Sequence, residues 1–509
     1  MKFFSETKMR KADFGLRTFR LTVNLCLSIL ALHPQTTSAQ TGRYWDHNLN
    51  SEAALLSGAV VAGEGGIAAI YYNPATITEM ERDNLSLSAN LFSLYFFDAK
   101  SALGGDLPAN RLQFDVYPRM ITLTLIPKKH SNLTVEMAYF TKTSDFIQIN
   151  QGTSHSLDFI EANPGDEQYA ADYYLRSKFE DFYGGAGVGY RVSNSLALGF
   201  SGLISYKDDQ YYNIVTADAF AGTGEDFQNQ YLASSRYHLK YTQFDVRLVT
   251  KLGVHLKKKY WALGATLSLP SVKLFGNGTV VKQYEYSNVF KETGDPESNN
   301  LFYGGRQRQC PAHFKDPLSV AAGANYYSAS GKTILLLTAE YFFGIETYDY
   351  IEAKEEPGED GYNYTPFEPE EWLSFKLEQR PVLNAGIAIK QQINSNIVYS
   401  GGFRTDFNYI ENQGQQMSAG GNFKSVYMFD VYHFNSGLSF SFKRGSVTLG
   451  MQYSYGRANN QEQIVNLEDP VEYIDDSIMP LTGYTGDVVQ VRYNDVSIYC
   501  GFIFDFIKK

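Results

Sequence analysis

The chain has 509 residues, a formal net charge of −11 and a mean hydropathy of −0.29. This acidic balance argues against nucleic acid or an anionic surface as a partner. Tyrosine and phenylalanine are abundant, with 38 and 35 copies, against only 3 tryptophans. A membrane β-barrel needs apolar residues at only half of its strand positions and carries aromatic girdles, so these averages are compatible with a barrel.

Residues 1–39 are predicted to be a secretory signal peptide. A basic stretch at 8–20 precedes an apolar core at 21–32, and a small-residue cleavage site follows at 37–39. The core is shorter than the roughly 18 apolar residues of a membrane helix, and no later stretch approaches that length. Membrane crossing by helices is therefore excluded on sequence grounds.

From residue 84 to 509, apolar residues alternate with small or polar ones at a period of two, which is typical of β-strands. In one example Trp261, Leu263 and Leu267 share a face, with Gly264 and Thr266 opposite. About fourteen strands are predicted: 84–97, 112–127, 131–149, 172–191, 195–214, 235–257, 259–284, 314–329, 332–351, 373–391, 395–411, 423–443, 446–462 and 488–507. The pattern predicts an all-β fold, a transmembrane antiparallel β-barrel.

The junctions between these strands alternate strictly between short and long. The short ones fall at 128–130, 192–194, 257–259, 328–331, 392–395 and 443–446. The long ones fall near 98–111, 150–171, 215–234, 285–313, 352–372, 412–422 and 463–487. Minimal periplasmic turns and elaborated extracellular loops would produce this difference, whereas a soluble β-sandwich has no reason to keep its two ends so unlike.

Residues 40–83 precede the first strand and are rich in small residues, notably in 57–66. Because wall side chains alone cannot fill a barrel of about fourteen strands, we expect this segment to be a hatch inside the lumen. Glycine permits the close backbone approach that such packing needs. The alternative is a disordered periplasmic leader, which the apolar content of the segment argues against.

The run from Ser57 to Met80, SGAVVAGEGGIAAIYYNPATITEM, resembles the hatch of FadL-type transporters, outer-membrane barrels that admit long-chain fatty acids and other hydrophobic compounds. Stretches 402–408 and 265–274 resemble barrel strands of that family. The resemblance implies a passive channel for hydrophobic small molecules in the cell outer membrane. The residues that it places on the hatch and substrate path are Ser57, Gly58, Gly63, Glu64, Gly65, Asn73, Pro74 and Ala75.

In FadL-type proteins the ligand leaves sideways, through a gap made by a kinked third strand. The candidate here is the polar interruption at Thr141, Thr143 and Asp145, which a bulge or bend would explain. However, Ile147 and Ile149 fall on the same odd-numbered positions as the preceding apolar row, so the sequence requires no bulge. We therefore prefer the interpretation that the strand has already left the membrane at this point.

Two other classes of function remain as alternatives. A barrel of the secretion-shuttle type would hold a protein partner with its extracellular loops, which include the acidic stretch 346–371. An enzyme is not predicted, because the HExxH and GxSxG motifs are absent and the glycine run 184–189 lies in a strand. We predict a monomer in contact with outer-membrane lipid, with no cofactor, no metal site and no catalytic residues.

Overall fold

The computed structural model describes residues 42–45, 49–127, 132–161, 165–221, 231–289, 299–410, 429–474, 478–486 and 488–506. The predicted signal peptide, 1–39, and the predicted turn at 128–130 lie outside these residues. No helix in the described part of the chain is long and apolar enough to span a membrane.

Fourteen antiparallel strands of the described chain close into a barrel, because the first strand pairs with both the second and the last. In order around the wall they are β1 (Asn84–Lys100), β2 (Ala109–Leu125), β3 (Leu133–Leu157), β4 (Glu167–Arg191), β5 (Leu196–Ala221), β6 (Tyr231–Lys257), β7 (Trp261–Ser268), β10 (Ser319–Tyr327), β11 (Thr333–Phe342), β15 (Val382–Gln392), β16 (Ile397–Asp406), β17 (Val431–Phe442), β18 (Gly445–Gln461) and β21 (Val489–Asp505). The predicted fold class and strand number are confirmed.

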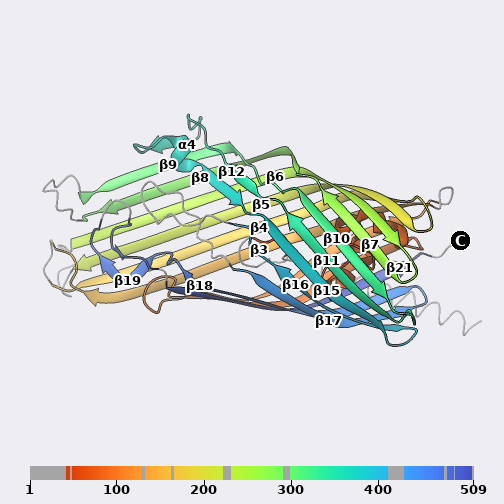
Figure 1. Ribbon diagram of the computed structural model, residues 1–509. Helices are drawn as coiled ribbons and strands as arrows, with labels where there is room; N and C mark the ends of the chain where they lie inside the picture. Colours follow the sequence, from red (N-terminus) through yellow and green to blue (C-terminus); the bar gives the residue numbers. More distant parts are fainter. Residues whose placement is uncertain are drawn as a thin grey trace, which may run out of the picture.

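The two ends of the barrel differ as the junction lengths predict (Figure 1). At the tight-turn end, described connections such as 192–195 and 443–444 are only a few residues long. At the long-loop end, the connections carry further secondary structure. On the outside of β5, Leu198, Phe200, Ile204 and Tyr206 face outward and are exposed, and Asp208 then begins a polar stretch. The apolar band of the wall therefore lies toward the tight-turn end.

Three predicted strands are interrupted. The strand predicted at 259–284 breaks at 269–271, where Pro270 lacks the N–H that a ladder needs. Its second part, β8 (Val272–Ser287), pairs with β6 and with β9 (Leu301–Pro311), a loop strand that the sequence did not predict.

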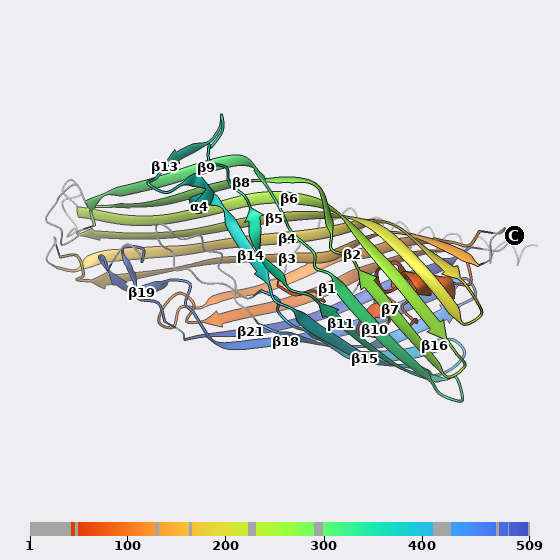
Figure 2. The ribbon, with the colours of Figure 1, turned by 45° about the horizontal axis from the view of Figure 1, so that its top comes forward.

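Similar breaks at 343–344 and 380–381 separate β11 and β15 from a small inner sheet of two strands. Figure 2 shows this part of the long-loop end, where the remaining loop elements also lie. These elements are β12 (Ile345–Ile351), β13 (Tyr362–Tyr364), α4 (Pro369–Leu373), β14 (Phe375–Gln379), β19 (Asn466–Val471) and β20 (Thr482–Gly483).

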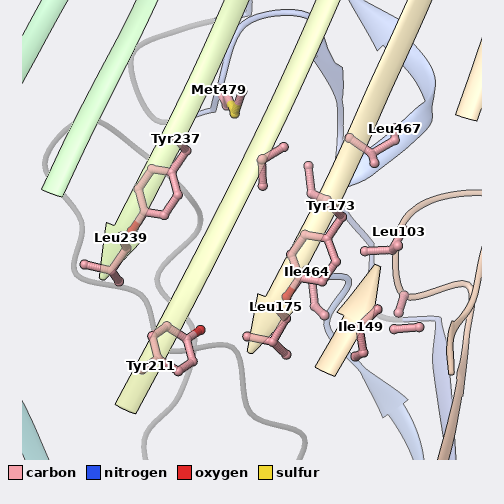
Figure 3. Close-up of a cluster of buried hydrophobic side chains, with 14 of the residues drawn as sticks. Leu103, Ile149, Tyr173, Leu175, Tyr211, Tyr237, Leu239, Ile464, Leu467 and Met479 are labelled. Carbon is pink, nitrogen blue, oxygen red and sulfur yellow. The ribbon is translucent and has the colours of Figure 1, made fainter. Parts of the chain in front are cut away.

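Strand length divides the barrel into a long side and a short side. Strands β3 to β6 have 25 to 27 residues, whereas β7, β10, β11, β15 and β16 have 8 to 11. On the long side, inward-facing residues near the long-loop end form a buried apolar cluster with residues from the loops. Figure 3 shows Tyr173, Tyr211 and Tyr237 of the wall, together with Leu467 and Met479 of the loops.

Candidate functional site

The N-terminal residues 49–83, here called the lumen segment, pack against the inner face of the wall at the tight-turn end (Figure 2, red). The preceding residues 42–45 lie farther toward the long-loop end, where Arg43 bridges to Asn408 and Tyr44 stacks on Phe342. The lumen segment forms four short helices, α2 (Ser51–Leu55), η1 (Gly66–Ala68), α3 (Ala69–Tyr72) and η2 (Pro74–Glu79). Asparagine begins two of them, since the side chains of Asn50 and Asn73 accept N–H bonds from Ala53 and Ala75.

Asn73, the first residue of the Asn-Pro-Ala tripeptide, is fully buried and joins the lumen segment to the wall. Its side-chain amide donates to the carbonyl of Val61 at 2.7 Å and to that of Val254, on β6, at 3.0 Å. Its Oδ1 accepts the N–H of Ala75 at 3.0 Å. Pro74 follows at the first helical position, where its missing N–H costs nothing. Through Asn73, the tripeptide therefore anchors the lumen segment to the backbone of β6.

The lumen segment lies on a ring of wall glycines contributed by ten of the fourteen strands, here called the glycine girdle. A Cβ atom at any of these positions would press on the lumen segment. At Gly199, for example, it would lie 2.1 Å from the carbonyl carbon of Pro74. The girdle comprises Gly187, Gly189, Gly199, Gly253, Gly264, Gly323, Gly386, Gly402, Gly437, Gly450 and Gly501. Close backbone approach between segment and wall therefore requires glycine at this level of the barrel.

Ser57 and Gly58 end helix α2 and turn the chain. Both have positive φ, 51° and 72°, and Gly58 donates its N–H to the carbonyl of Ala53 at 2.9 Å, as in a helix C-cap. The Ser57 hydroxyl is buried and accepts a bond from the amide of Asn435, on β17, at 2.9 Å. These two residues fix the path of the segment across β15, β16 and β17.

Gly63, Glu64 and Gly65 form a second turn, which an ion pair links to the wall. Gly63 and Glu64 have φ of 106° and 68°, and Gly65 lies close to Val60. The carboxylate of Glu64 accepts from Lys390 of β15 at 2.8 Å and from Tyr327 of β10 at 3.3 Å. Burial alone would raise the pKa of Glu64, but Lys390, Lys257 and the hydrogen bond from Tyr327 together outweigh burial and lower this pKa.

All eight predicted path residues therefore lie on the lumen segment at its contacts with itself and the wall. Sequence reasoning missed the surface that receives them. The sequence assigns the glycine run 184–189 to a strand, but glycine also recurs near the tight-turn end of nine further strands, and these glycines were not recognised as a set. That recurrence is the signal in the sequence that could have found the girdle.

Strand β3 is continuous from Leu133 to Leu157 and has one irregularity. Thr141 pairs with Phe182 and Thr143 with Asp181, so Lys142 is an extra residue, a β-bulge, opposite β4. Before the bulge, outward positions carry odd numbers; after it, Ile147 and Ile149 face inward and are buried. The sequence interpretation that both stretches keep one phase is wrong, because the extra residue reverses the faces.

Strands β2 and β3 separate just before the bulge. Their ladder in the described structure runs from Leu125–Val135 to Met120–Phe140 and stops there. Farther toward the long-loop end, β2 pairs only with β1 and β3 only with β4. Near the end of both strands, Gln151 donates to Asn110 at 3.4 Å. Between these points lies an interruption in the barrel wall, here called the β2–β3 seam, bordered by Thr141, Thr143 and Asp145.

Three aromatic rings lie beside the end of the seam that is nearer the tight turns. Tyr71 of the lumen segment meets Phe140 of β3 and Tyr183 of β4 edge-on, with ring centroids 5.6 and 5.9 Å away. Phe140 and Tyr183 stack at 5.2 Å. The ammonium of Lys251 lies 3.7 Å from the Tyr71 centroid, and that of Lys142 lies 5.9 Å from the Tyr183 centroid. We call this group the Tyr71 cluster.

A polar layer separates the Tyr71 cluster from the apolar cluster at the long-loop end. Lys207 of β5 lies 2.8 Å from Asp181 and 3.0 Å from Asp316. Beside it Arg247 lies 2.9 Å from Asp245. On β4, β5 and β6 alike, the inward positions change from apolar to charged and back to apolar. These five charges are paired with one another, as the low dielectric of a protein interior favours.

No protein-family model and no curated protein matches the chain. Among solved structures, the Pseudomonas putida toluene transporter TodX is 12% identical, covers 92% of this chain and all of its own, and has a TM-score of 0.52. A deltaS2 mutant of the TodX monoaromatic hydrocarbon channel is 12% identical, covers 91% of this chain and all of its own, and has a TM-score of 0.53. The barrel therefore has the FadL-type transporter fold that residues 57–80 suggested.

Proposed function

We propose that this protein is an outer-membrane channel that passively admits hydrophobic small molecules. The observation that carries the proposal is the β2–β3 seam, which begins at Phe140 beside the Tyr71 cluster, at the edge of the apolar band. The known activity of TodX, a toluene transporter of the same fold, agrees with this class of cargo. The chain would act as a monomer, since the proposed path lies within one barrel.

The proposed path runs from the apolar cluster at the long-loop end to the seam, and then sideways into the membrane. A straight path along the lumen would end against the lumen segment, which packs on the wall at the tight-turn end. Lateral exit into lipid keeps apolar surface away from water, which the hydrophobic effect favours by about 25 cal/mol per Å². Thr141, Thr143 and Asp145 would border this exit.

The cargo that the Tyr71 cluster fits best is a hydrophobic molecule with a carboxylate, such as a long-chain fatty acid. Lys251 and Lys142 approach the faces of Tyr71 and Tyr183, and no ion pair to either lysine is found within the described residues. Aromatic walls would hold the chain of such a ligand, and an ammonium would hold its head group. A neutral aromatic hydrocarbon would use the walls alone.

Deletion of Lys142 tests the path, because it removes the bulge from β3. The pairing of β3 with β2 would then continue past Phe140 and close the seam. Cells lacking their own uptake of these compounds would express the wild type, the deletion or Lys142→Ala. We expect the deletion to reduce uptake of radiolabelled oleate and of toluene at least tenfold. Lys142→Ala keeps the extra residue, so toluene uptake should stay near wild type while oleate uptake falls severalfold.

Circular dichroism of the purified variants would establish that the barrels are folded. A folded deletion variant with unchanged uptake of both compounds would overturn the lateral path. The alternative function, a scaffold for a protein partner, is favoured by the length of β3 to β6 beyond the apolar band. A wild-type protein that supports no uptake of either compound would favour that alternative.

A further inference from the structure

The outward face of β4, β5 and β6 changes from apolar to charged in rows that the strand pairing defines. The last apolar row contains Phe182, Tyr206 and Val246, which are partners across the three strands. Glu180 and Asp208 lie in the next row toward the long-loop end. Two rows farther on, Arg176, Tyr212 and Lys240 are direct cross-strand neighbours. Basic side chains thus appear at a defined height above the apolar band.

Arg176 and Lys240 share the ring of Tyr212. The guanidinium carbon of Arg176 lies 5.9 Å from the ring centroid, and the ammonium of Lys240 lies 4.9 Å from it. Arg176 also lies 5.5 Å from the ring of Phe146, which belongs to the adjacent row nearer the membrane. Its Nε is buried and has no hydrogen-bond acceptor in the structure. The arginine is therefore held in place by two rings and keeps donor capacity unused.

The carboxylates near Arg176 and Lys240 form ion pairs with other basic side chains. Lys178 lies 2.7 Å from Glu180 and 3.9 Å from Asp208. Farther toward the long-loop end, Arg236 lies 3.4 Å from Glu285. Neither Arg176 nor Lys240 has an ion pair with any residue that the structure places. Two like charges beside one ring repel each other, and an anion between them would remove that repulsion.

The backbone of the pair lies above the head-group region of a bilayer, and the long basic side chains reach down toward that region. Six residues separate Tyr206 from Tyr212, which is about 20 Å along a strand and about 14 Å in height at a tilt near 45°. The head groups occupy roughly the first 5–8 Å beyond the hydrocarbon core. Arginine and lysine side chains reach several ångströms along the surface, and Arg176 leans toward the membrane over Phe146.

We propose that Arg176 and Lys240, on either side of Tyr212, bind the phosphate of a membrane-lipid head group in the leaflet that faces the long-loop end. The pair combines a forked donor with a point charge, which suits a phosphate whose acyl chains lie on the apolar band below. The net charge of −11 belongs to the whole chain and does not describe this row. The inference rests on the membrane placement in the proposed function, not on transport.

The test compares lipid binding by the wild type, Arg176→Ala/Lys240→Ala and Lys178→Ala, each purified in a neutral maltoside detergent. Lys178 is the matched control, since it is a cation on the same face whose charge Glu180 and Asp208 already neutralise. Native mass spectrometry would follow titration with dioctanoyl phosphatidic acid, dioctanoylglycerol and inorganic phosphate. We expect the wild type to bind the phosphatidic acid at least tenfold more tightly than the other two probes.

The double variant should lose this preference, whereas Lys178→Ala should stay within about twofold of the wild type. Equal loss in both variants, or an unchanged preference in a folded double variant, would overturn the proposal. Equal affinity for inorganic phosphate would also overturn it, because it would define a site for soluble anions. Oleate and toluene uptake by the double variant should be normal, so failed transport in the wild type would count against the channel alone.

Discussion

The two halves of this barrel are closed in different ways. At the tight-turn end, the lumen segment lies directly on the glycine girdle, and the buried amide of Asn73 bonds to carbonyls of the segment and of β6. At the long-loop end, large side chains from the wall and the loops meet in an apolar cluster, and the β2–β3 ladder has already ended. The tight-turn half is closed largely by backbone contacts, whereas the long-loop half is closed by packed side chains.

The difference indicates which half can admit a ligand. Close contacts between backbones leave no side chain that can turn away, and separating them would break buried hydrogen bonds. An apolar cluster held by rings and loops can open locally, because side chains change rotamer without disturbing the ladders. We therefore expect the lumen segment to stay fixed while ligands enter and leave on the side of the loops and the seam.

The largest effect is expected from Gly199→Val, which would break the seal at the tight-turn end. Its Cβ would lie 2.1 Å from the carbonyl carbon of Pro74 and 2.2 Å from the nitrogen of Ala75. Neither backbone atom can rotate away, so we expect the lumen segment to be displaced at a free-energy cost of about 4 kcal/mol or more. Single-channel recordings in planar bilayers would detect the opened lumen as a new ion conductance.

Gly202→Val is the matched control for this substitution. It lies on the same strand, β5, and the nearest heavy atom to its Cβ would be on the ring of Phe200 at 3.8 Å, an ordinary contact. We expect this variant to show no new ion conductance in the same recordings. A Gly199→Val variant with no new ion conductance and a wild-type free energy of unfolding would show that the girdle does not fix the lumen segment.

The sequence predicted the barrel, its strand number and its two unlike ends because alternation and junction length are local properties of the chain. The Asn-Pro-Ala motif likewise indicated a specialised segment at 57–80. The seam could not be predicted, since it depends on how many residues of β2 pair with β3. The single extra residue Lys142 also reverses the faces of β3 without leaving a clear trace in a stretch that is polar on both sides.

Asn73→Ala should have the second-largest effect, because it removes a fully buried hydrogen-bonding side chain that links the lumen segment to β6. The substitution deletes three hydrogen bonds of 2.7 to 3.0 Å and leaves the carbonyls of Val61, in a buried contact, and of Val254 without this donor. We expect the lumen segment to be destabilised by about 2–4 kcal/mol. Hydrogen–deuterium exchange should speed up in 66–79 and stay slow in the strands of β4 and β5. Equal exchange rates of 66–79 in the wild type and the variant would show that Asn73 does not anchor the lumen segment.

The smallest effect concerns two carboxyl groups of the lumen segment whose pKa values shift in opposite directions. Burial raises the pKa of Glu52 above its ordinary 4.5, although Lys390 opposes this. For Glu64, burial is outweighed by Lys390 together with Lys257 and Tyr327, and the pKa falls below 4.5. Ionised Glu64 therefore stabilises the fold above pH 4.5, and this contribution is lost as the pH falls through its lowered pKa. Ionised Glu52 opposes folding as the pH rises above 4.5.

Glu64→Gln should consequently lower, and Glu52→Gln raise, the free energy of unfolding at pH 7. Because Glu64 and Lys390 are both partly exposed, with 16% and 32% of their side chains accessible, we expect only about 1 kcal/mol in each case. Urea unfolding in detergent, followed by tryptophan fluorescence at several pH values, would measure both differences. The two differences should converge toward zero as the pH falls below 4.5. Shifts of the same sign at pH 7 would mean that Lys390 does not distinguish the two carboxyl groups.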